Sequence, residues 1–211
     1  MKNRYFTKFC GITSIKDAIN AQNIGCNAIG FVFVKKSKRY IDPLLCKNII
    51  NQLNPGMLVV GLFADNTEVE ITEILDICSI HVLQFHGSES VNFCNHWNKP
   101  YWKAVPMADG VNPIEYAQRY DNAQAYLIDN FGTKKSGGSG ERFNWKLLPQ
   151  NLSNKWILAG GLTPENIFDA VKQTNITCFD VSSGIESKPG IKSKQKMKQF
   201  IKNLTKTNRE K

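Results

Sequence analysis

The sequence predicts a single α/β domain folded as a (β/α)8 TIM barrel with eight parallel strands. Eight short apolar segments alternate along the chain with segments whose apolar residues recur every three or four positions, such as Ile15, Ala18 and Ile19. Strands that are separated by helices cannot form hairpins, so they must lie parallel with both faces of the sheet covered. Eight such repeats in about 200 residues suit the smallest closed barrel better than an open doubly wound sheet.

The expected strands are nearly continuous apolar segments, as is typical of buried parallel strands. In chain order they cover residues 5–10, 28–33, 58–63, 81–85, 101–105, 125–129, 156–159 and 178–181. Helix starts are indicated by capping residues, twice with proline at the first helical position. These signals are Thr13 and Ser14 for the first helix, Asp42-Pro43 for the second, Asn66-Thr67 for the third, Ser88 for the fourth and Thr163-Pro164 for the seventh. Residues 109–120 show only weak helical periodicity.

The length of 211 residues and the 42% hydrophobic content suit one hydrophobic core. We expect one barrel domain over residues 1–205 and a basic, disordered tail over residues 206–211. The net charge of +9 first suggests nucleic acid, a membrane surface or an anionic ligand as partner. Residues 188–211 contain nine basic side chains and one acidic one, which leaves the rest of the chain at +1. We therefore expect a small anionic substrate and neither nucleic acid nor a membrane as partner.

The compartment is predicted from what the sequence lacks. The first residues contain no apolar segment suited to a signal peptide, and no segment approaches the ~20 apolar residues of a membrane span. The six cysteines show neither a CxxC pair nor zinc-type spacing to histidine. We expect a cytoplasmic protein with reduced thiols and no metal.

In a TIM barrel the active site lies at the carboxyl ends of the strands. Gly160 and Gly161 follow the seventh expected strand, and Ser182 and Ser183 follow the eighth. Small residues let backbone N–H groups approach an oxyanion, and a short helix start after the eighth strand would add its positive dipole end. These two adjacent loops predict a phosphate site. The Gly-rich residues 136–140, including Gly138 and Gly140, have the length of a lid over the site.

Two groups suited to proton transfer end strands on opposite sides of the barrel mouth. Cys10 ends the first strand and Asp129 ends the sixth, so that a small sugar phosphate between them would meet one group on each face. Arg39 closes a basic segment after the second strand, and its planar guanidinium suits a carboxylate. His86 can contact the ligand or form a local hydrogen bond, and Asp180 can bind substrate or orient the Ser182-Ser183 loop.

Six sequence motifs together resemble the phosphoribosylanthranilate isomerase family. They are Lys8-Phe9-Cys10-Gly11-Ile12-Thr13; Gly30-Phe31-Val32-Phe33 with Ser37-Lys38-Arg39-Tyr40; Gln84-Phe85-His86-Gly87; Gly137-Gly138-Ser139-Gly140; Ala159-Gly160-Gly161-Leu162-Thr163-Pro164-Glu165-Asn166; and Asp180-Val181-Ser182-Ser183-Gly184-Ile185-Glu186. The resemblance implies a TIM barrel, no metal or organic cofactor, and a step of tryptophan biosynthesis. That step is the Amadori rearrangement of N-(5-phosphoribosyl)anthranilate to the corresponding 1-deoxyribulose 5-phosphate.

The same resemblance implies a role for each site residue. Cys10 would be the general base, Asp129 the general acid and Arg39 the partner of the anthranilate carboxylate. A thiol with an ordinary pKa of ~8.5 needs a positive neighbour to be a thiolate at neutral pH, and Lys8 is one candidate because it points the same way as Cys10. His86 and Asp180 would bind substrate.

Other barrels remain as alternatives. A ribulose-phosphate epimerase would need histidine and aspartate metal ligands at strand ends, where only His86 of the three histidines stands. Indole-glycerol-phosphate synthase would need lysine and glutamate at strand ends. In this sequence Cys10 stands where the first of these residues, the lysine, would be expected. The oligomeric state, monomer or homodimer, stays open.

Overall fold

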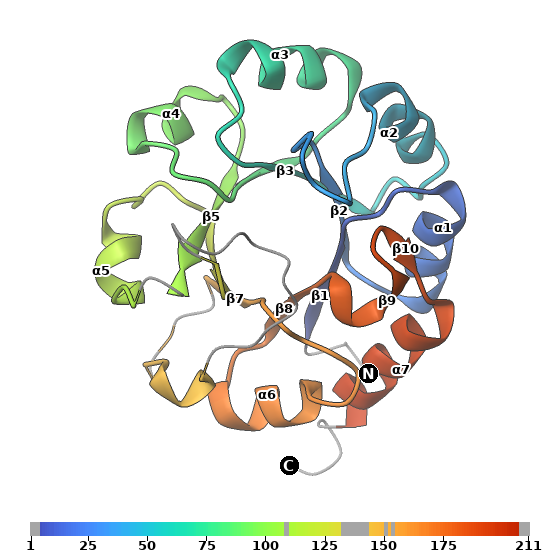
Figure 1. The fold of residues 1–211 in the computed structure, drawn as a ribbon, viewed down its shortest axis with the longest axis vertical. Coiled ribbons are helices and arrows are strands. Elements are labelled where there is room, and N and C mark those ends of the chain that lie inside the picture. The colour runs from blue at the N-terminus through green and yellow to red at the C-terminus, as the bar shows by residue number, and fades with distance from the viewer. Residues whose placement is uncertain (1–4, 108–109, 132–143, 150–151, 153–154, 207–211) are drawn as a thin grey trace.

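A computed structural model describes residues 5–107, 110–131, 144–149, 152 and 155–206. Its centre is a closed barrel in which strands β1 to β8 follow one another in sequence order, each parallel to its neighbours. Figure 1 shows the strands as an inner ring with the helices around it. The predicted eight-stranded parallel barrel is therefore confirmed. The expected basic tail at residues 206–211 lies outside the described residues apart from Lys206, the last residue of helix α7.

The strands agree with the expected segments to within one residue at each end. They are β1 (Phe6–Cys10), β2 (Ala28–Val32), β3 (Leu58–Phe63), β4 (Val82–Phe85), β5 (Tyr101–Pro106), β6 (Ala125–Asp129), β7 (Trp156–Leu158) and β8 (Cys178–Val181). The register of β1 against β8 places Lys8 beside Asp180, which matters for the site below.

The helices begin at side chains that accept hydrogen bonds from the first backbone N–H groups. The outer elements are α1 (Ile15–Ile24), α2 (Pro43–Ile50), α3 (Glu68–Ile77), α4 (Val91–His96), α5 (Pro113–Gln118), α6 (Ile167–Thr174) and α7 (Lys194–Lys206). Ser14, Asp42 and Thr67 cap α1, α2 and α3 as predicted, and Thr67 forms a capping box with Glu70. The weakly periodic residues 109–120 contain the short helix α5 with Asn112 as its cap.

Two predicted helix starts were wrong. Helix α4 is capped by Ser90 and not by Ser88, because Ser88 lies in the loop held by Asp65, whose carboxylate accepts the Ser88 N–H at 2.7 Å. Helix α6 begins at Ile167, three residues beyond Pro164. The intervening residues form a turn in which the Asn166 side chain accepts the Thr163 N–H at 2.9 Å.

Regular helices do not follow every strand of the described chain. After β6 the described residues contain only the 3-10 helix η2 (Trp145–Leu147), capped by Asn144. After β8 comes the 3-10 helix η3 (Ser183–Ile185), and the small antiparallel pair β9 (Glu186–Lys188) and β10 (Ile191–Lys192) precedes α7. The sequence analysis did not foresee this pair, which carries Glu186 into the site.

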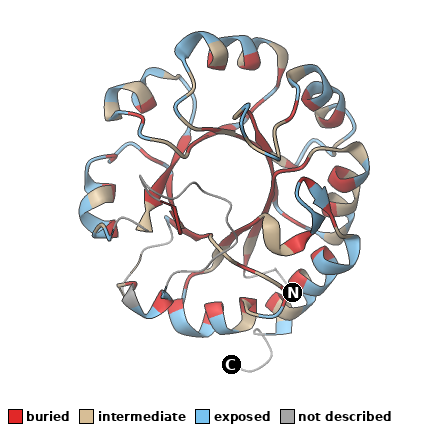
Figure 2. Cartoon of the chain, viewed as in Figure 1, coloured by how far each residue is buried: buried red, intermediate tan, exposed pale blue. Residues whose placement is uncertain are grey.

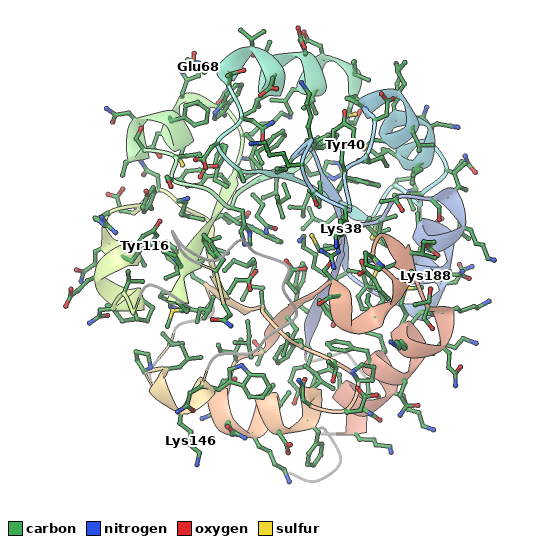
Figure 3. All side chains as sticks on the ribbon, viewed as in Figure 1. Lys38, Tyr40, Glu68, Tyr116, Lys146 and Lys188 are labelled. Carbon is green, nitrogen blue, oxygen red and sulfur yellow. The ribbon has the colours of Figure 1, made fainter. Side chains whose placement is uncertain are left out.

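The barrel interior has an apolar floor and a polar upper layer. The floor is a separate buried cluster that includes Ala28, Val60, Trp102, Leu127 and Ile157, joined by residues near the amino-terminal ends of the strands. Strand residues that alternate with these face outward and pack under the helices. Figure 2 shows the strand ring as almost entirely buried, and Figure 3 shows side chains filling the ring that looks open in the ribbon. The floor leaves only the carboxyl end of the barrel open to a ligand.

Candidate active site

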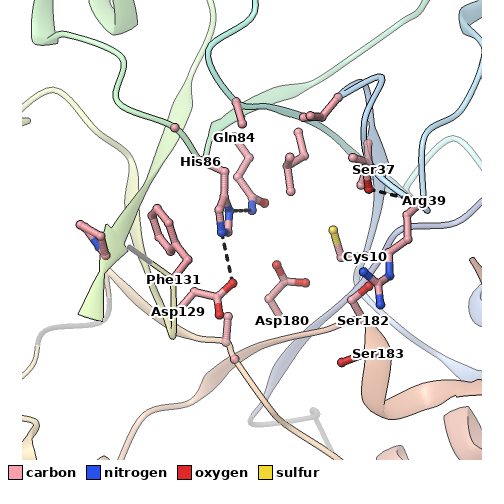
Figure 4. A pocket seen from close by; sticks show the side chains of 18 of the residues that line it. Cys10, Ser37, Arg39, Gln84, His86, Asp129, Phe131, Asp180, Ser182 and Ser183 are labelled. Carbon is pink, nitrogen blue, oxygen red and sulfur yellow. Dashed lines mark hydrogen bonds and ion pairs between the residues drawn. The ribbon is translucent and has the colours of Figure 1, made fainter. Parts of the chain in front are cut away.

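A pocket opens at the carboxyl ends of the strands, where the sequence analysis placed the site. It is lined by all the described residues that were predicted to act there: Cys10, Arg39, His86, Asp129, Gly160, Gly161, Asp180, Ser182 and Ser183. Figure 4 shows Cys10 and Asp129 on different sides of this pocket with Asp180 between them. The predicted lid residues Gly138 and Gly140 lie outside the described residues.

Cys10 belongs to a buried polar group that also contains Lys8 and Asp180. Lys8 Nζ lies 2.8 Å from Asp180 Oδ2, and its positive charge acts on the Cys10 thiol. Lys8, Cys10 and Asp180 point inward because they alternate with outward residues of β1 and β8. Gly30 of β2 leaves room for them, since a Cβ there would stand 2.9 Å from both Cys10 Sγ and Lys8 Nζ. A side chain at position 30 would displace this group.

The positive charge of Lys8 lowers the pKa of the Cys10 thiol, but it does not outweigh the effect of burial. Burial raises the pKa of the Cys10 thiol, Lys8 lowers it, and Asp180 raises it again, so that the pKa lies above its ordinary value. Burial alone would lower the pKa of Lys8, but the charges of Asp180 and Cys10 outweigh burial and raise it. Lys8 is therefore a cation beside a thiol that is mostly protonated at neutral pH. Lys8, the positive neighbour proposed from the sequence, lies beside the thiol and lowers its pKa, while burial raises it by more.

Asp180 has one carboxylate oxygen without a protein donor. Its Oδ2 binds Lys8, while Oδ1 is buried and accepts no hydrogen bond from the described residues. A buried acceptor without a donor is unfavourable unless a ligand or water supplies one. Among the described residues Asp180 bonds Lys8 and not the Ser182-Ser183 loop, so the loop-orienting alternative gains no support. Substrate binding through the second oxygen stays a prediction.

Asp129 is held by a short chain of side chains from β4. His86 Nε2 lies 3.2 Å from Asp129 Oδ2, and Gln84 Nε2 lies 3.1 Å from His86 Nδ1. The imidazole ring also packs on Phe131, with the ring centroids 4.5 Å apart. Figure 4 draws both polar contacts as dashed lines. His86 thus makes local bonds, one of the two possibilities that the sequence left open.

Arg39 is already engaged by a carboxylate of the chain. Its Nε and Nη2 donate to Glu186 at 2.8 and 2.9 Å in a bidentate pair, and Lys192 Nζ lies 2.7 Å from the same carboxylate. Burial raises the pKa of Glu186, but the bonds from Arg39 and Lys192 bring it below its ordinary value. Arginine has five N–H donors, so this pair leaves donors on Nη1 and Nη2 for an anion in the pocket. Glu186 and Lys192 were missed because they lie far from Arg39 in the sequence.

The loops after β7 and β8 touch at the place where the sequence predicts a phosphate site. Gly160 and Gly161 have φ values of 74° and 67°, a region that favours glycine. A Cβ at Gly184 would stand 1.9 Å from the carbonyl oxygen of Leu162, so the two loops touch there without room for a side chain. The helix start expected after β8 is the three-residue helix η3, so the backbone N–H groups of the loops, and not a long helix dipole, would meet an oxyanion.

The loop that carries His86 is held from below by a buried ion pair. Lys103 Nζ lies 2.8 Å from Glu89 Oε2 and donates to the Gly87 carbonyl at 2.6 Å. Glu89 in turn accepts the N–H groups of Asp65 and Gly87. The Lys103 side chain points outward from β5 and lies under the loop. Its contacts here are structural.

Comparison with known proteins shows the family of the chain. The sequence model of a family described as N-(5'-phosphoribosyl)anthranilate (PRA) isomerase matches residues 7–203. The chain belongs to this family. N-(5'-phosphoribosyl)anthranilate isomerases of Nitrosococcus oceani and Pseudomonas fluorescens are 42% and 43% identical to the chain. The matches cover 95% and 92% of this chain and 98% and 96% of the two relatives.

Solved phosphoribosylanthranilate isomerases share the fold over almost the whole chain. The Thermotoga maritima enzyme matches with a TM-score of 0.84 and 34% identity, covering 96% of this chain and 99% of its own. Another family member, solved in complex with reduced 1-(o-carboxyphenylamino)-1-deoxyribulose 5-phosphate, matches with a TM-score of 0.78 and 30% identity over 96% of this chain and 99% of its own. Both structures have the family's name and fold, in agreement with the barrel described above.

Neither a membrane-spanning helix nor a metal-binding cluster occurs among the described residues. Among the helices described, none is both long and apolar enough to span a bilayer. The same residues contain no group of three histidine, cysteine, aspartate or glutamate side chains placed to hold a metal ion.

Proposed function

We propose that this chain isomerises N-(5-phosphoribosyl)anthranilate to 1-(2-carboxyphenylamino)-1-deoxyribulose 5-phosphate, an Amadori rearrangement in tryptophan biosynthesis. The observation that carries the proposal is one pocket with a thiol, Cys10, and a carboxylate, Asp129, on different walls beside two small-residue loops. The ligand named for the solved relative is a reduced form of the proposed product. An acid and a base on opposite faces of a small sugar phosphate are what this isomerisation requires.

The proton transfers assign one role to each group. Asp129 gives its proton to the furanose ring oxygen, the bond from that oxygen to C1′ breaks, and the anthranilate nitrogen forms a Schiff base with C1′. Cys10 as thiolate then removes the proton from C2′, and the electron pair moves to the nitrogen to give an enolamine. The enolamine tautomerises to the ketone, and a proton returns to C1′. No oxidant, reductant or cofactor enters this balance.

Substrate binding would use the remaining pocket residues. The N–H groups of the loops containing Gly160, Gly161, Ser182 and Ser183, all of which line the pocket, would bind the phosphate. Arg39 offers its free guanidinium donors to the anthranilate carboxylate. The unpaired Asp180 Oδ1 would accept a ribose hydroxyl. His86 reaches the ligand only beside Asp129, so its binding role is secondary in this proposal.

The proposal also covers the domain boundary, the cellular compartment and the oligomeric state. We place the domain boundary near residue 205, as a barrel needs the last helix, α7, to cover β1 and β8. We also place the reaction in the cytoplasm, where the six free cysteines, including the proposed base, would stay reduced. One solved relative from Thermotoga maritima is described as dimeric. For this chain a monomer and a homodimer both suit a site built within one barrel.

The decisive assay follows the loss of phosphoribosylanthranilate fluorescence in the presence of purified protein. Cys10→Ala and Asp129→Ala should each lower kcat at least ~100-fold, since each removes one proton-transfer group. Cys178→Ala is the matched control, because this thiol lies at the barrel floor and its loss should leave kcat unchanged. Circular dichroism checks that each variant is folded. Near wild-type turnover in either site variant would contradict the assignment.

A further inference from the structure

One side chain of the pocket has no role in the mechanism above. Gln84 of β4 is fully buried and lines the pocket; its amide nitrogen hydrogen-bonds His86, and its Oε1 has no hydrogen-bond partner among the described residues. Gln84 and His86 point inward together because they are two residues apart along the strand direction. The Gln84 amide nitrogen ends 3.1 Å from His86 Nδ1, and the opposite ring nitrogen faces Asp129. The amide therefore meets the imidazole on the side away from the proposed acid.

We propose that Gln84 is a positioning residue that holds His86 as a neutral imidazole with its proton on Nε2, and that this N–H fixes the proposed general acid Asp129. The inference rests on the proposed function for the role of Asp129, but its first half concerns only the ring proton.

The proton positions follow from the donors and acceptors around the ring. A carboxylate oxygen 3.2 Å from Nε2 needs a donor, so Nε2 carries a proton. An amide N–H directed at Nδ1 needs an acceptor, so Nδ1 carries none. The reversed amide would turn its oxygen toward Nδ1 and require a second proton there. Gln84 thus selects the neutral tautomer, because the hydrogen bond made by one ring nitrogen generally decides whether the other nitrogen carries the proton.

The neutral ring matters because of what stands beside it. An imidazolium next to Asp129 would add a charge-assisted bond that favours the carboxylate and opposes its protonated form. A neutral N–H holds the carboxyl group in place with less bias against the proton that the acid must carry. Because this N–H occupies Oδ2, the transferable proton belongs on Oδ1. That oxygen lies against Gly160, where a Cβ would approach it to 2.7 Å.

Nuclear magnetic resonance of the ring nitrogens tests the tautomer directly, since the chain has only three histidines. In 15N-histidine-labelled wild type at neutral pH, His86 should show one protonated and one unprotonated nitrogen, with the proton on Nε2. His81 is an internal reference, because its Nδ1 accepts the Val59 N–H at 3.0 Å. His96 is exposed and does not line the pocket, so it serves as a second reference signal. A His86→Gln sample assigns the signals.

Variants at Gln84 separate positioning from packing. Gln84→Glu places a carboxylate at Nδ1 and should give a doubly protonated His86, with kcat lowered ~10-fold or more and KM within ~3-fold. Gln84→Leu removes the donor with similar bulk and should give mixed tautomers and a smaller fall in kcat. Gln124→Glu, which adds the same charge at the opposite end of the barrel, should change neither the His86 signals nor kcat.

Each result decides one part of the inference. A proton on Nδ1 in the wild type, or an unchanged His86 signal in Gln84→Glu, would overturn the tautomer assignment. A doubly protonated His86 ring in Gln84→Glu with unchanged kcat would show that the neutral ring does not matter for Asp129 as the acid. Absence of turnover in the wild type with the expected tautomer would reject the proposed function and leave the proton assignment standing.

Discussion

The thiol of Cys10 is harder to ionise than an ordinary thiol. Burial raises its pKa, and Lys8 supplies the largest opposing effect. The thiolate fraction therefore grows as the pH rises, and catalysis by this base should grow with it through the neutral to mildly alkaline range. The two charged neighbours act on the thiol in opposite directions, which provides a test at the scale of single residues.

Lys8→Met should make the thiol harder to ionise. We expect kcat at neutral pH to fall at least ~10-fold, and alkylation of Cys10 to require a higher pH, because a positive charge in contact is lost. Asp180→Asn should shift alkylation toward lower pH, since Asp180 raises the pKa of Cys10. Iodoacetamide modification, mapped by mass spectrometry with Cys10→Ala as the blank, measures both shifts. Identical alkylation profiles for the wild type and Lys8→Met would remove Lys8 from this role.

Elements that bury one face could be predicted from the sequence, and elements fixed by loop contacts could not. The strands are continuous apolar segments, so their places were predicted to within a residue. The start of α6 was misplaced because Asn166 binds back to Thr163 and the Gly161 carbonyl and extends the turn. The Arg39 pair with Glu186 spans 147 residues, a distance at which a single sequence carries no pairing signal.

The contact between the loops after β7 and β8 gives a prediction at the scale of elements. Gly184→Ala should push these loops apart, because its Cβ would meet the Leu162 carbonyl oxygen, which belongs to the backbone. We expect KM to rise ~10-fold or more with a smaller change in kcat, as phosphate binding uses both loops. Gly56→Ala is the control, since a Cβ there meets nothing within 4 Å. Titration with inorganic phosphate as a competitive inhibitor should show the same loss.

Across the whole molecule, the basic residues divide into two groups. Lys36, Lys38 and Lys188 line the pocket, whereas Lys198 and Lys202 lie on helix α7 outside it. Figure 3 shows Lys38 over the barrel mouth and Lys188 on the β9 side. Most of the net charge lies in residues 188–211, and much of that charge sits on α7. The basic side chains at the pocket are therefore a different set from those on the outer helix.

Salt dependence should reveal this division. Lys36→Gln combined with Lys188→Gln should lower kcat/KM ~2- to 5-fold at low ionic strength and weaken its fall with added salt. Lys198→Gln combined with Lys202→Gln removes the same charge from α7 and should leave both quantities unchanged. Steady-state rates between low and physiological salt measure the difference. An equal response of the two double variants would show that net charge, and not its location, attracts the substrate.

The pairing of β1 with β8 also has a consequence for how the protein is made. Lys8 and Asp180 are 172 residues apart and meet only across this last seam of the barrel. A chain emerging from the ribosome holds Cys10 from the start but cannot surround it until β8 has been synthesised. During most of translation the thiol therefore has no Asp180 beside it, and the site assembles late and in one step with ring closure.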